Sequence, residues 1–527
     1  MSLDKFFPAE IYMRSSPRTS AKFAGLVLAI LAGFGPEAFS AEDQFEVILS
    51  HLPAKQSAEY KALRDVAAPS GEQDLAMTGA EMWTVPDARY GALREAATKQ
   101  GVTLRRLDDS ASPELATVMT GSKMTPVQQE MMHKAMESKA AVGMSMIMLP
   151  EAATMEYALT KRMNEPAGSA PQTILIPLNQ QLTVTAQRTE VSKTDDGYIW
   201  RGVIDGSGEP VTLLWWPSGR LAGTVMYKGH AYVIKNLEGN MHGMLELTPD
   251  KMPPDHGAAS HDLMQKMNMR TDPLVHEGDA SMMLPAQMQP PPTKMAPVEG
   301  APKEATIALI VAYTKKAASH YTDIVKDMID VAIAQTNQSF RDSGVGNVHV
   351  KLAHAYETDY IESGSHFEDV YRFRNKGDGY LDEIHDLRAK YGADVAVLVV
   401  DNPVGCGLSI RIAPEAPDAF TVVDHECAST MYSLAHEIGH LIGARHDRAL
   451  DDSTQPFPYG HGFVNGKEWR TMMSYKDSCD GCPRRPIWSS PDVKVDGVPA
   501  GDAETNNAKV IREGAARVAA FHTQLKP

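Results

Sequence analysis

The pattern of hydrophobic and polar positions changes several times along the chain. In residues 42–165 methionines recur at helical spacing, as at Met132 and Met136 and again at Met144 and Met148. Methionine at such positions is more often a core residue than a functional one. This region is therefore predicted to be mostly helical.

Residues 172–250 follow a different pattern. Segments such as Val211–Trp216 are separated by Gly, Pro and Ser turns, which predicts antiparallel β-structure. That pattern ends at residue 252. Residues 252–302 contain nine prolines in 51 residues, whereas the whole chain of 527 residues contains 34. This segment is predicted to be an extended linker that proteases can reach.

From Thr306 onward, short apolar runs alternate with amphipathic segments, which predicts an α/β (α+β) domain over residues 303–527. The N-terminal region, residues 41–251, is predicted to be helical over 42–165 and rich in β-structure over 172–250. Strands are expected at Ile307–Tyr313, Val348–Leu352 and Asp394–Val400, and helices at 324–340, 381–390 and 507–521.

The first 40 residues have the features of an export signal. Lys22 precedes the apolar run Phe23–Gly35, and Ala38–Ser40 offers small residues at which a signal peptidase would cut. That run is too short for a bilayer span, which needs about 20 residues. We therefore expect a signal peptide over residues 1–40 and a secreted or periplasmic protein without stable membrane association. An N-terminal membrane anchor is the alternative.

Composition limits the partners of the chain. It is 43% hydrophobic and 22% charged, as in an ordinary globular protein. The formal net charge of −16 argues against nucleic acid as a partner, because phosphate binding requires a basic surface.

The four cysteines lie in the C-terminal half, at Cys406, Cys427, Cys479 and Cys482. In an exported protein an even number of cysteines predicts disulfides. Three pairings are possible, and proximity in sequence favours Cys406 with Cys427 and Cys479 with Cys482. A zinc knuckle or a redox site at Cys479–Cys482 is disfavoured, because the chain has neither a second such pair nor the βαβ context.

Residues 436–446 read His-Glu-Ile-Gly-His-Leu-Ile-Gly-Ala-Arg-His. His436 and His440 are four residues apart, so on a helix both imidazoles lie on one face and can reach one ion. Gly443 can end that helix in a left-handed conformation, which lets His446 supply a third nitrogen. Three protein ligands leave one position open, which distinguishes a catalytic zinc from a structural one.

Glu437 lies beside the first of these histidines, where it can act on water without coordinating the metal. The sequence therefore predicts an endopeptidase in which zinc-activated water attacks the peptide bond and Glu437 is the general base. The predicted cofactor is Zn2+, and the predicted partners are protein or peptide substrates. His425 and His461 are interpreted as structural or surface residues.

The extended motif is followed by Asp447 and by Arg470-Thr471-Met472-Met473-Ser474-Tyr475. With these residues the sequence resembles the metzincins, which are metallopeptidases with a methionine turn beneath the zinc, and Asp447 resembles their reprolysin-like branch. Tyr459–Gly462 and Trp488–Pro491 are similar to segments of the bacterial secreted peptidyl-Asp metallopeptidases. This resemblance covers about residues 305–525.

The resemblance implies a metzincin-like domain with a mixed twisted sheet and a zinc-binding active-site helix. It assigns Met473 to the methionine turn and makes Tyr475 a candidate catalytic residue, with packing below the site as the alternative. Gly407–Ile412 becomes the candidate edge strand for an extended substrate. Residues 42–302 become a propeptide with its linker.

The same resemblance implies cleavage on the amino side of Asp and secondarily of Glu. In metzincins the chain after the methionine turn walls the site for the residue beyond the scissile bond, and here it contains Lys476, Arg484 and Arg485. A guanidinium can bind a carboxylate through two charge-assisted hydrogen bonds. Arg484 matches the family segment better than Arg485. Ordinary surface charges are the alternative.

Latency cannot depend on a propeptide cysteine, because none precedes Cys406. Asp255 and His256 are within reach of the metal, but their place in the linker favours solvated residues.

Two functions of other classes compete with the peptidase hypothesis. The first is an exported Met-rich copper-binding protein, because soft ligands of this kind bind Cu(I). The ligands concerned are His261, Met264, Met267 and Met269. The second is an inactive peptidase-like binding module, which the complete ligand set and Glu437 disfavour.

Overall fold

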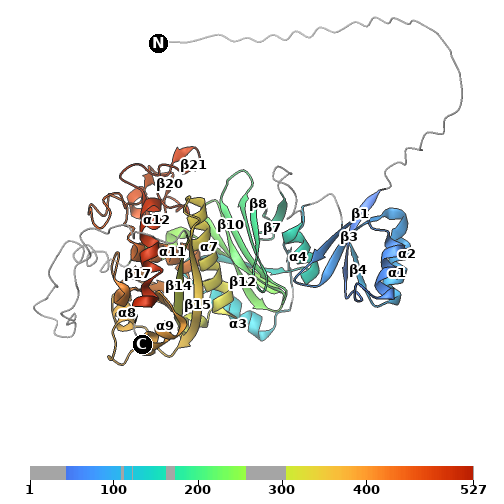
Figure 1. The fold of residues 1–527 in the computed structure, drawn as a ribbon, viewed down its shortest axis with the longest axis horizontal. Coiled ribbons are helices and arrows are strands. Elements are labelled where there is room, and N and C mark those ends of the chain that lie inside the picture. The colour runs from blue at the N-terminus through green and yellow to red at the C-terminus, as the bar shows by residue number, and fades with distance from the viewer. Residues whose placement is uncertain (1–42, 108–111, 122, 162–171, 257–303, 526–527) are drawn as a thin grey trace, which may run out of the picture.

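The computed structural model of the chain describes residues 43–107, 112–121, 123–161, 172–256 and 304–525. These residues form three parts in a row (Figure 1). A small α/β unit lies at one end, a large antiparallel sheet in the middle, and a mixed α/β part at the other end. The predicted signal peptide and most of the predicted linker lie outside the described residues.

The N-terminal unit is a four-stranded antiparallel sheet in the order β2-β3-β1-β4. Alternation along β1 directs Phe45, Val47 and Leu49 to one face, where they pack against two helices, and Ile48 to the other, where it packs near Tyr157. The elements are β1 (Gln44–Ser50), β2 (Gly71–Leu75), β3 (Ala80–Pro86), β4 (Thr103–Arg106), α1 (Ala58–Ala67), α2 (Tyr90–Lys99) and α4 (Ala152–Thr160).

The prediction of a mostly helical region at residues 42–165 is therefore wrong. This region also contains β5 (Thr117–Val118), α3 (Pro126–Ala135) and β6 (Ala141–Met148), and both strands belong to the middle sheet. Met144 and Met148 lie on β6. A spacing of four residues places two side chains on one face of a strand as well as of a helix, so the methionine pattern fits either element.

The middle part is a nine-stranded antiparallel sheet in the order β5-β6-β13-β12-β11-β10-β9-β8-β7. It confirms the antiparallel structure predicted for residues 172–250. Beyond β5 and β6, its strands are β7 (Thr173–Pro177), β8 (Thr183–Lys193), β9 (Tyr198–Ile204), β10 (Pro210–Trp216), β11 (Arg220–Tyr227), β12 (His230–Glu238) and β13 (Met241–Leu247).

Both faces of this sheet are covered near its centre. On β10, Leu213 and Trp215 face the core of the middle part, whereas Leu214 and Trp216 pack with Val331 of the C-terminal part. Strand β10 is consequently a nearly continuous buried run rather than a simple alternation. The middle sheet is thus docked on the C-terminal part.

The C-terminal part contains a mixed five-stranded sheet in the order β15-β14-β16-β18-β17. Four strands run parallel, and β17 pairs antiparallel with β18 at the sheet edge. The strands are β14 (Ala305–Thr314), β15 (Val348–Thr358), β16 (Val395–Val400), β17 (Gly407–Ser409) and β18 (Phe420–Asp424). The predicted α/β class and mixed sheet are confirmed.

Helices cover both faces of this sheet. Along β14, Leu309 and Val311 face the core shared with α7 (Asp330–Asp342), α11 (Ser433–Ile442) and α12 (Asn507–Val518). Ile310 and Ala312 face the opposite core, which contains residues of α8 (His366–Arg374) and α9 (Glu383–Tyr391). The candidate active-site helix α11 is therefore packed against the sheet and not on the periphery.

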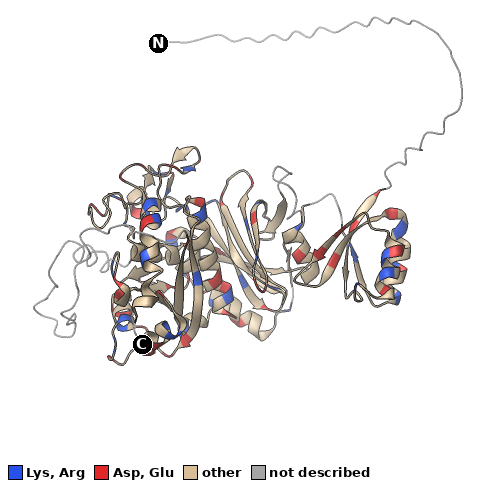
Figure 2. Cartoon of the chain, in the orientation of Figure 1, with Lys and Arg blue, Asp and Glu red and all other residues tan. Residues whose placement is uncertain are grey.

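Two disulfides join Cys406 to Cys427 and Cys479 to Cys482, which confirms the pairing favoured by the sequence. Lys and Arg are interspersed with Asp and Glu over the ribbon, and α1 and α2 carry both signs (Figure 2). Within the described residues, no helix is both long and apolar enough to cross a membrane.

Candidate active site

Helix α11 carries two histidines one turn apart. His436 and His440 are almost completely buried, with exposed fractions of 2% and 0%. The helix ends at Gly443, whose φ of 132° favours glycine, and a side chain there would meet the ring of Phe457 at 2.9 Å. The chain then turns and brings His446 beside the helix.

The imidazoles of this group face one another through Nε2. His436 Nδ1–H donates to Met472 O over 3.1 Å, and His440 Nδ1–H donates to Ala444 O over 2.9 Å. Because carbonyl oxygens only accept, these bonds leave both Nε2 atoms as lone-pair donors. His436 Nε2 lies 3.3 Å from His446 Nε2.

A fourth imidazole joins them from the end of the middle part. His256 Nε2 lies 3.2 Å from His446 Nε2, and His256 Nδ1–H donates to Gly407 O. The donor atoms of four buried histidines lie within 4.8 Å of one another. These residues are His256, His436, His440 and His446.

This donor set fits a metal ion. Nitrogens about 2.0–2.1 Å from a tetrahedral zinc lie about 3.3–3.4 Å apart, close to the 3.2 and 3.3 Å found here. Since His256 and His436 carry their ring protons on Nδ1, His446 Nε2 can donate to only one of them. Among the described residues, His440 Nε2 is buried without a hydrogen-bond partner. A cation between the rings would satisfy these lone pairs.

Burial lowers the pKa of His436 and of His440 well below the ordinary histidine value. Both rings are therefore held neutral, which is the form that binds metal ions.

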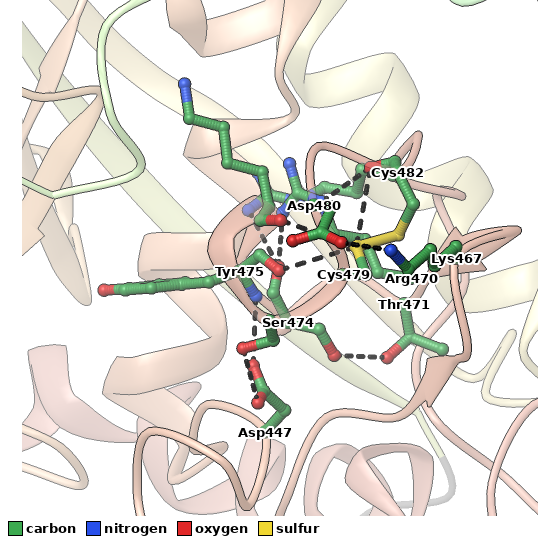
Figure 3. The surroundings of a disulfide bond; sticks show 12 residues. Asp447, Lys467, Arg470, Thr471, Ser474, Tyr475, Cys479, Asp480 and Cys482 are labelled. Carbon is green, nitrogen blue, oxygen red and sulfur yellow. Dashed lines mark hydrogen bonds and ion pairs between the residues drawn. A yellow bond between two sulfur atoms is a disulfide. The ribbon is translucent and has the colours of Figure 1, made fainter.

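The loop after His446 is tied to the methionine turn. Asp447 Oδ2 accepts from the Tyr475 N–H over 3.1 Å, and Oδ1 accepts from the Ser478 hydroxyl over 2.8 Å (Figure 3). His461 Nδ1–H donates to His446 O over 2.9 Å. His461 is fully buried, so its role is structural and it is not a surface residue.

Met473 lies beneath α11. A Cβ added at Gly439 would be 2.9 Å from Met473 Sδ and 2.6 Å from the ring of Trp488. The absence of a side chain at Gly439 therefore allows the methionine and the indole to approach the backbone of the helix that carries His436 and His440.

Glu437 lies next to His436 and points toward β17. Its Oε2 accepts from Ser409 Oγ over 2.8 Å, and its Oε1 is 3.7 Å from His256 Nδ1. A Cβ at Gly407 would be 2.7 Å from Oε1, so glycine is required there for the carboxylate to fit. Burial raises the pKa of Glu437 to about 8, and the Ser409 hydrogen bonds oppose that rise.

Tyr475 packs against the histidines. Its ring centroid is 4.3 Å from that of His446 and 5.5 Å from that of His256. Burial raises the pKa of Tyr475 well above its ordinary value, so the phenol is neutral. Packing accounts for its position, and a catalytic role stays a prediction.

Asp255 lies between two buried arginines. Arg484 Nη2 donates to Asp255 Oδ1 over 2.8 Å, Arg470 Nη1 donates to Oδ2 over 3.1 Å, and the Lys476 N–H is 3.3 Å from Oδ2. Burial alone would raise the pKa of Asp255, but Arg470 and Arg484 outweigh it and lower that pKa to about 2. We call Arg470 and Arg484 the arginine pair.

The prediction that Asp255 and His256 are solvated linker residues is wrong. Both are buried, with exposed fractions of 6% and 5%, and Met252 is buried as well. Proline at positions 253 and 254 favours extended backbone, which is also the conformation that pairs with an edge strand. The prolines therefore mark a docked segment at the start of the predicted linker.

Arg485 lies apart from this group. Its Nη2 is 3.3 Å from the Asp496 carboxylate, which is largely exposed. Arg484, by contrast, also donates to Met431 O over 2.6 Å, and its side chain is only 3% exposed. The interpretation of Arg484 as an ordinary surface charge is thus wrong, whereas Arg485 has the partner expected of a surface residue.

Sequence reasoning missed Arg470 and Ser409. Arg470 opens the segment that resembles the methionine turn, but nothing in one sequence pairs it with Arg484. Ser409 lies on the predicted edge strand, and its contact with Glu437 depends on how that strand passes α11.

These features together define a metallopeptidase. A mixed sheet packs against a buried helix that carries two histidines and a glutamate, and a third histidine follows after a glycine turn. The family model described as Metallo-peptidase family M12 matches residues 303–485. A Peptidyl-Asp metalloendopeptidase of Xanthomonas campestris pv. campestris is 35% identical over 397 residues, which cover 70% of this chain and 90% of that protein.

A second Peptidyl-Asp metalloendopeptidase, from Stenotrophomonas maltophilia (strain R551-3), is 34% identical over 73% of this chain and 90% of its own length. The chain therefore belongs to the peptidyl-Asp metalloendopeptidase family and is a metalloendopeptidase. A solved structure titled "Structure of a chaperone-substrate complex" matches 42% of the chain and 35% of its own at 20% identity, with a TM-score of 0.34. That similarity is too low to inform the fold.

Proposed function

We propose that the mature form of this chain is a secreted zinc endopeptidase that cleaves on the amino side of Asp and secondarily of Glu. The observation that carries the proposal is the convergence of His436, His440 and His446 beside Glu437, next to an edge strand. The donors in this site are neutral imidazoles, which suit zinc.

The three histidines would hold the ion, and the loop contacts of Asp447 and His461 would fix the orientation of His446. A zinc ion bound there supplies Lewis-acid activation of water and of the scissile carbonyl. Met473 supports the helix that carries His436 and His440 from below.

Glu437 acts as the general base. One of its oxygens is held by Ser409 Oγ, which fixes the carboxylate, and the other lies 3.7 Å from His256 Nδ1. It takes a proton from the attacking water and delivers it to the departing amine. Tyr475 is neutral and adjacent to His446, and we propose that its hydroxyl donates to the developing oxyanion.

An extended substrate would lie along β17, the edge strand that begins at Gly407. Its outer side, which His256 contacts in the full chain, would then offer backbone groups for hydrogen bonds. Arg484 would bind the acidic side chain of the residue that follows the scissile bond, and its burial strengthens that interaction. Arg485 is the weaker candidate for this role because it pairs with Asp496.

Residues 41–251 would serve as a propeptide, followed by a linker, with the catalytic domain over 303–527. The signal peptide over residues 1–40 would export the chain to the periplasm or the medium. The names of the relatives, which describe peptidyl-Asp specificity in those proteins, support the proposed preference.

The copper-binding alternative rests on residues 261–269, which lie outside the described residues. The alternative of an inactive binding module is disfavoured because Glu437 and the three histidines are all buried in one site.

Digestion of a peptide library by the secreted, processed enzyme tests this function. Mass spectrometry should find cuts before Asp, fewer before Glu, and none after a chelator is added. Zinc added back should restore them. Random cut positions would refute the specificity, and cleavage that survives removal of the metal would refute the metalloenzyme mechanism.

A further inference from the structure

The segment before residue 257 lies along the edge strand where a substrate would bind. The Cys406 N–H donates to Pro254 O over 2.8 Å, and His256 Nδ1–H donates to Gly407 O. These contacts join the last described residues of the middle part to the edge of the catalytic sheet. An extended peptide docked on an edge strand makes hydrogen bonds of this type.

The side chain of Asp255 occupies the acid-binding site. Each of its oxygens accepts a charge-assisted hydrogen bond from one member of the arginine pair, Arg484 to Oδ1 and Arg470 to Oδ2. The carboxylate is 4% exposed, so both ion pairs are buried. A substrate aspartate entering this site would need the same donors, and it would find them occupied.

The next residue reaches the metal donors. His256 Nε2 is 3.2 Å from His446 Nε2, and its own ring proton is directed to Gly407 O. Its lone pair is therefore the fourth in a group otherwise made of His436, His440 and His446. His256 Nδ1 also lies 3.7 Å from Glu437 Oε1. The ring therefore takes up space beside the carboxylate that the attacking water would need.

The middle sheet holds Asp255 and His256 in place because it is docked on the C-terminal part. Arg220 forms a 2.5 Å ion pair with Asp327, and Gln335 Nε2 donates to Thr224 Oγ1 over 2.7 Å. Apolar residues of β12 and β13 also pack with the Cys406–Cys427 disulfide, and Met252 belongs to the same cluster. The segment is thus anchored on a folded domain only a few residues before the active site.

We propose that Asp255-His256 is a built-in inhibitor of this peptidase. Asp255 binds as the substrate's acidic residue does, between Arg470 and Arg484, and His256 supplies a fourth imidazole to the metal and excludes water from Glu437. Arg470 is thereby a second specificity-determining residue. This inference rests on the proposed function, because it takes the same site to bind metal and acidic substrates.

One consequence concerns activation. A cut after His256 leaves the inhibitory pair on the propeptide, which keeps its own contacts with the catalytic part. Cleavage in residues 257–302 therefore yields a nicked complex that stays inactive until the propeptide dissociates or is degraded.

The test uses the full chain with Glu437→Gln, which prevents self-cleavage, and adds Asp255→Asn or His256→Ala. In the Co2+-loaded proteins His256→Ala should change the visible absorption and release the metal to a chelator at least about tenfold faster. A labelled Asp-containing peptide should bind the Asp255→Asn variant but neither the parent nor His256→Ala, in which Asp255 still occupies the arginine pair. Two matched controls, His133→Ala and Asp250→Asn, alter exposed propeptide residues and should change nothing.

With Glu437 intact, Asp255→Asn should cleave an Asp peptide before processing, whereas the unprocessed parent should be silent. If His256→Ala leaves the cobalt spectrum and the metal release unchanged, or Asp255→Asn leaves the latency unchanged, the inhibitor proposal is refuted. Far-UV circular dichroism and the two control variants identify any loss of folding. If His256→Ala does not fold, peptide binding by Asp255→Asn tests the proposal instead. A processed enzyme that needs no metal would instead refute the proposed function itself.

Discussion

Asp255 Oδ1 lies 2.8 Å from Arg484 Nη2, although 229 residues separate them in the chain. A buried guanidinium needs a buried anion beside it, because an unpaired charge in the interior is strongly destabilising. In the full chain Asp255 is that anion. In the proposed function, release of the propeptide leaves the arginine pair without this anion, and an acidic substrate residue would take its place.

Arg484→Ala should therefore lower kcat/KM for an Asp-containing peptide far more than for the matched Asn peptide. A charge-assisted hydrogen bond contributes about 1.5–3 kcal/mol, so the Asp-over-Asn preference should fall roughly 10- to 150-fold. Steady-state kinetics of the processed enzyme on both peptides measure it.

Arg485→Ala is the matched control, because that side chain pairs with Asp496 and not with Asp255. It should leave the preference intact. Arg470→Gln should reduce the preference as Arg484→Ala does. Equal losses on the Asp and Asn peptides would mean that Arg484 only supports the fold.

Glu437→Gln should abolish hydrolysis and leave zinc bound. The change removes the base but keeps the shape of the side chain and the hydrogen bond from Ser409, and loss of a general base costs about 10²- to 10⁴-fold in kcat. Kinetics check the loss of hydrolysis, and metal analysis of the purified protein checks that zinc stays bound. Activity within about tenfold of the parent enzyme in a correctly folded variant is the outcome that contradicts the mechanism.

The sequence was sufficient to predict that His436, His440 and His446 come together and that the C-terminal part is α/β. The spacing of His436, His440 and His446 depends on helix geometry and one glycine turn, and both are local properties. The buried strands near residues 307–313 and 394–400 have long apolar runs, which leave little ambiguity.

The long-range contacts could not be predicted from the sequence. The docking of Asp255 and His256 depends on a pairing with Arg470, Arg484 and the edge strand, and proline content alone indicates a linker equally well. The small N-terminal sheet was missed for another reason. The methionines on which the helical prediction rested lie at α3 and on β6, outside that sheet, so their spacing carried no information about strands β1 to β4.

Maturation should cut the chain after His256 and at or before Pro302, leaving a catalytic fragment that begins near residue 303. The family model begins at residue 303 and β14 at Ala305, so such a cut leaves the catalytic sheet whole. N-terminal sequencing of the active secreted enzyme is the measurement. An active enzyme that still begins near Ala41 would make the N-terminal half a permanent domain.

The middle part contains a buried histidine, His242 on β13, whose environment makes the folded state sensitive to acid. The fully buried ring of His242 accepts hydrogen bonds at Nε2 from the Leu221 N–H, 3.0 Å away, and from Asn236 Nδ2, 3.1 Å away. Its Nδ1–H donates to Asn240 O over 3.1 Å. Nε2 cannot accept and carry a proton at once, so protonation would break these contacts.

Burial is the main cause that lowers the pKa of His242, to about 4, and nearby Arg220 lowers it further. A histidine in the unfolded chain has a pKa near 6.5. Between about pH 6.5 and 4, His242 is therefore protonated in the unfolded chain and neutral in the folded state. Stability must fall as the pH falls through that window, by up to about 3 kcal/mol from this residue.

In the Glu437→Gln background, His242→Gln should accordingly show a flatter dependence of the unfolding free energy on pH than its parent. Glutamine keeps an acceptor for the Leu221 N–H but does not titrate, so the stability difference between parent and variant should shrink or reverse from pH 7 toward pH 4.5. Urea unfolding at several pH values measures that difference. His133→Gln changes a histidine whose side chain is 75% exposed and should follow the parent at every pH. Parallel curves for the parent and His242→Gln would show that another group sets the acid sensitivity.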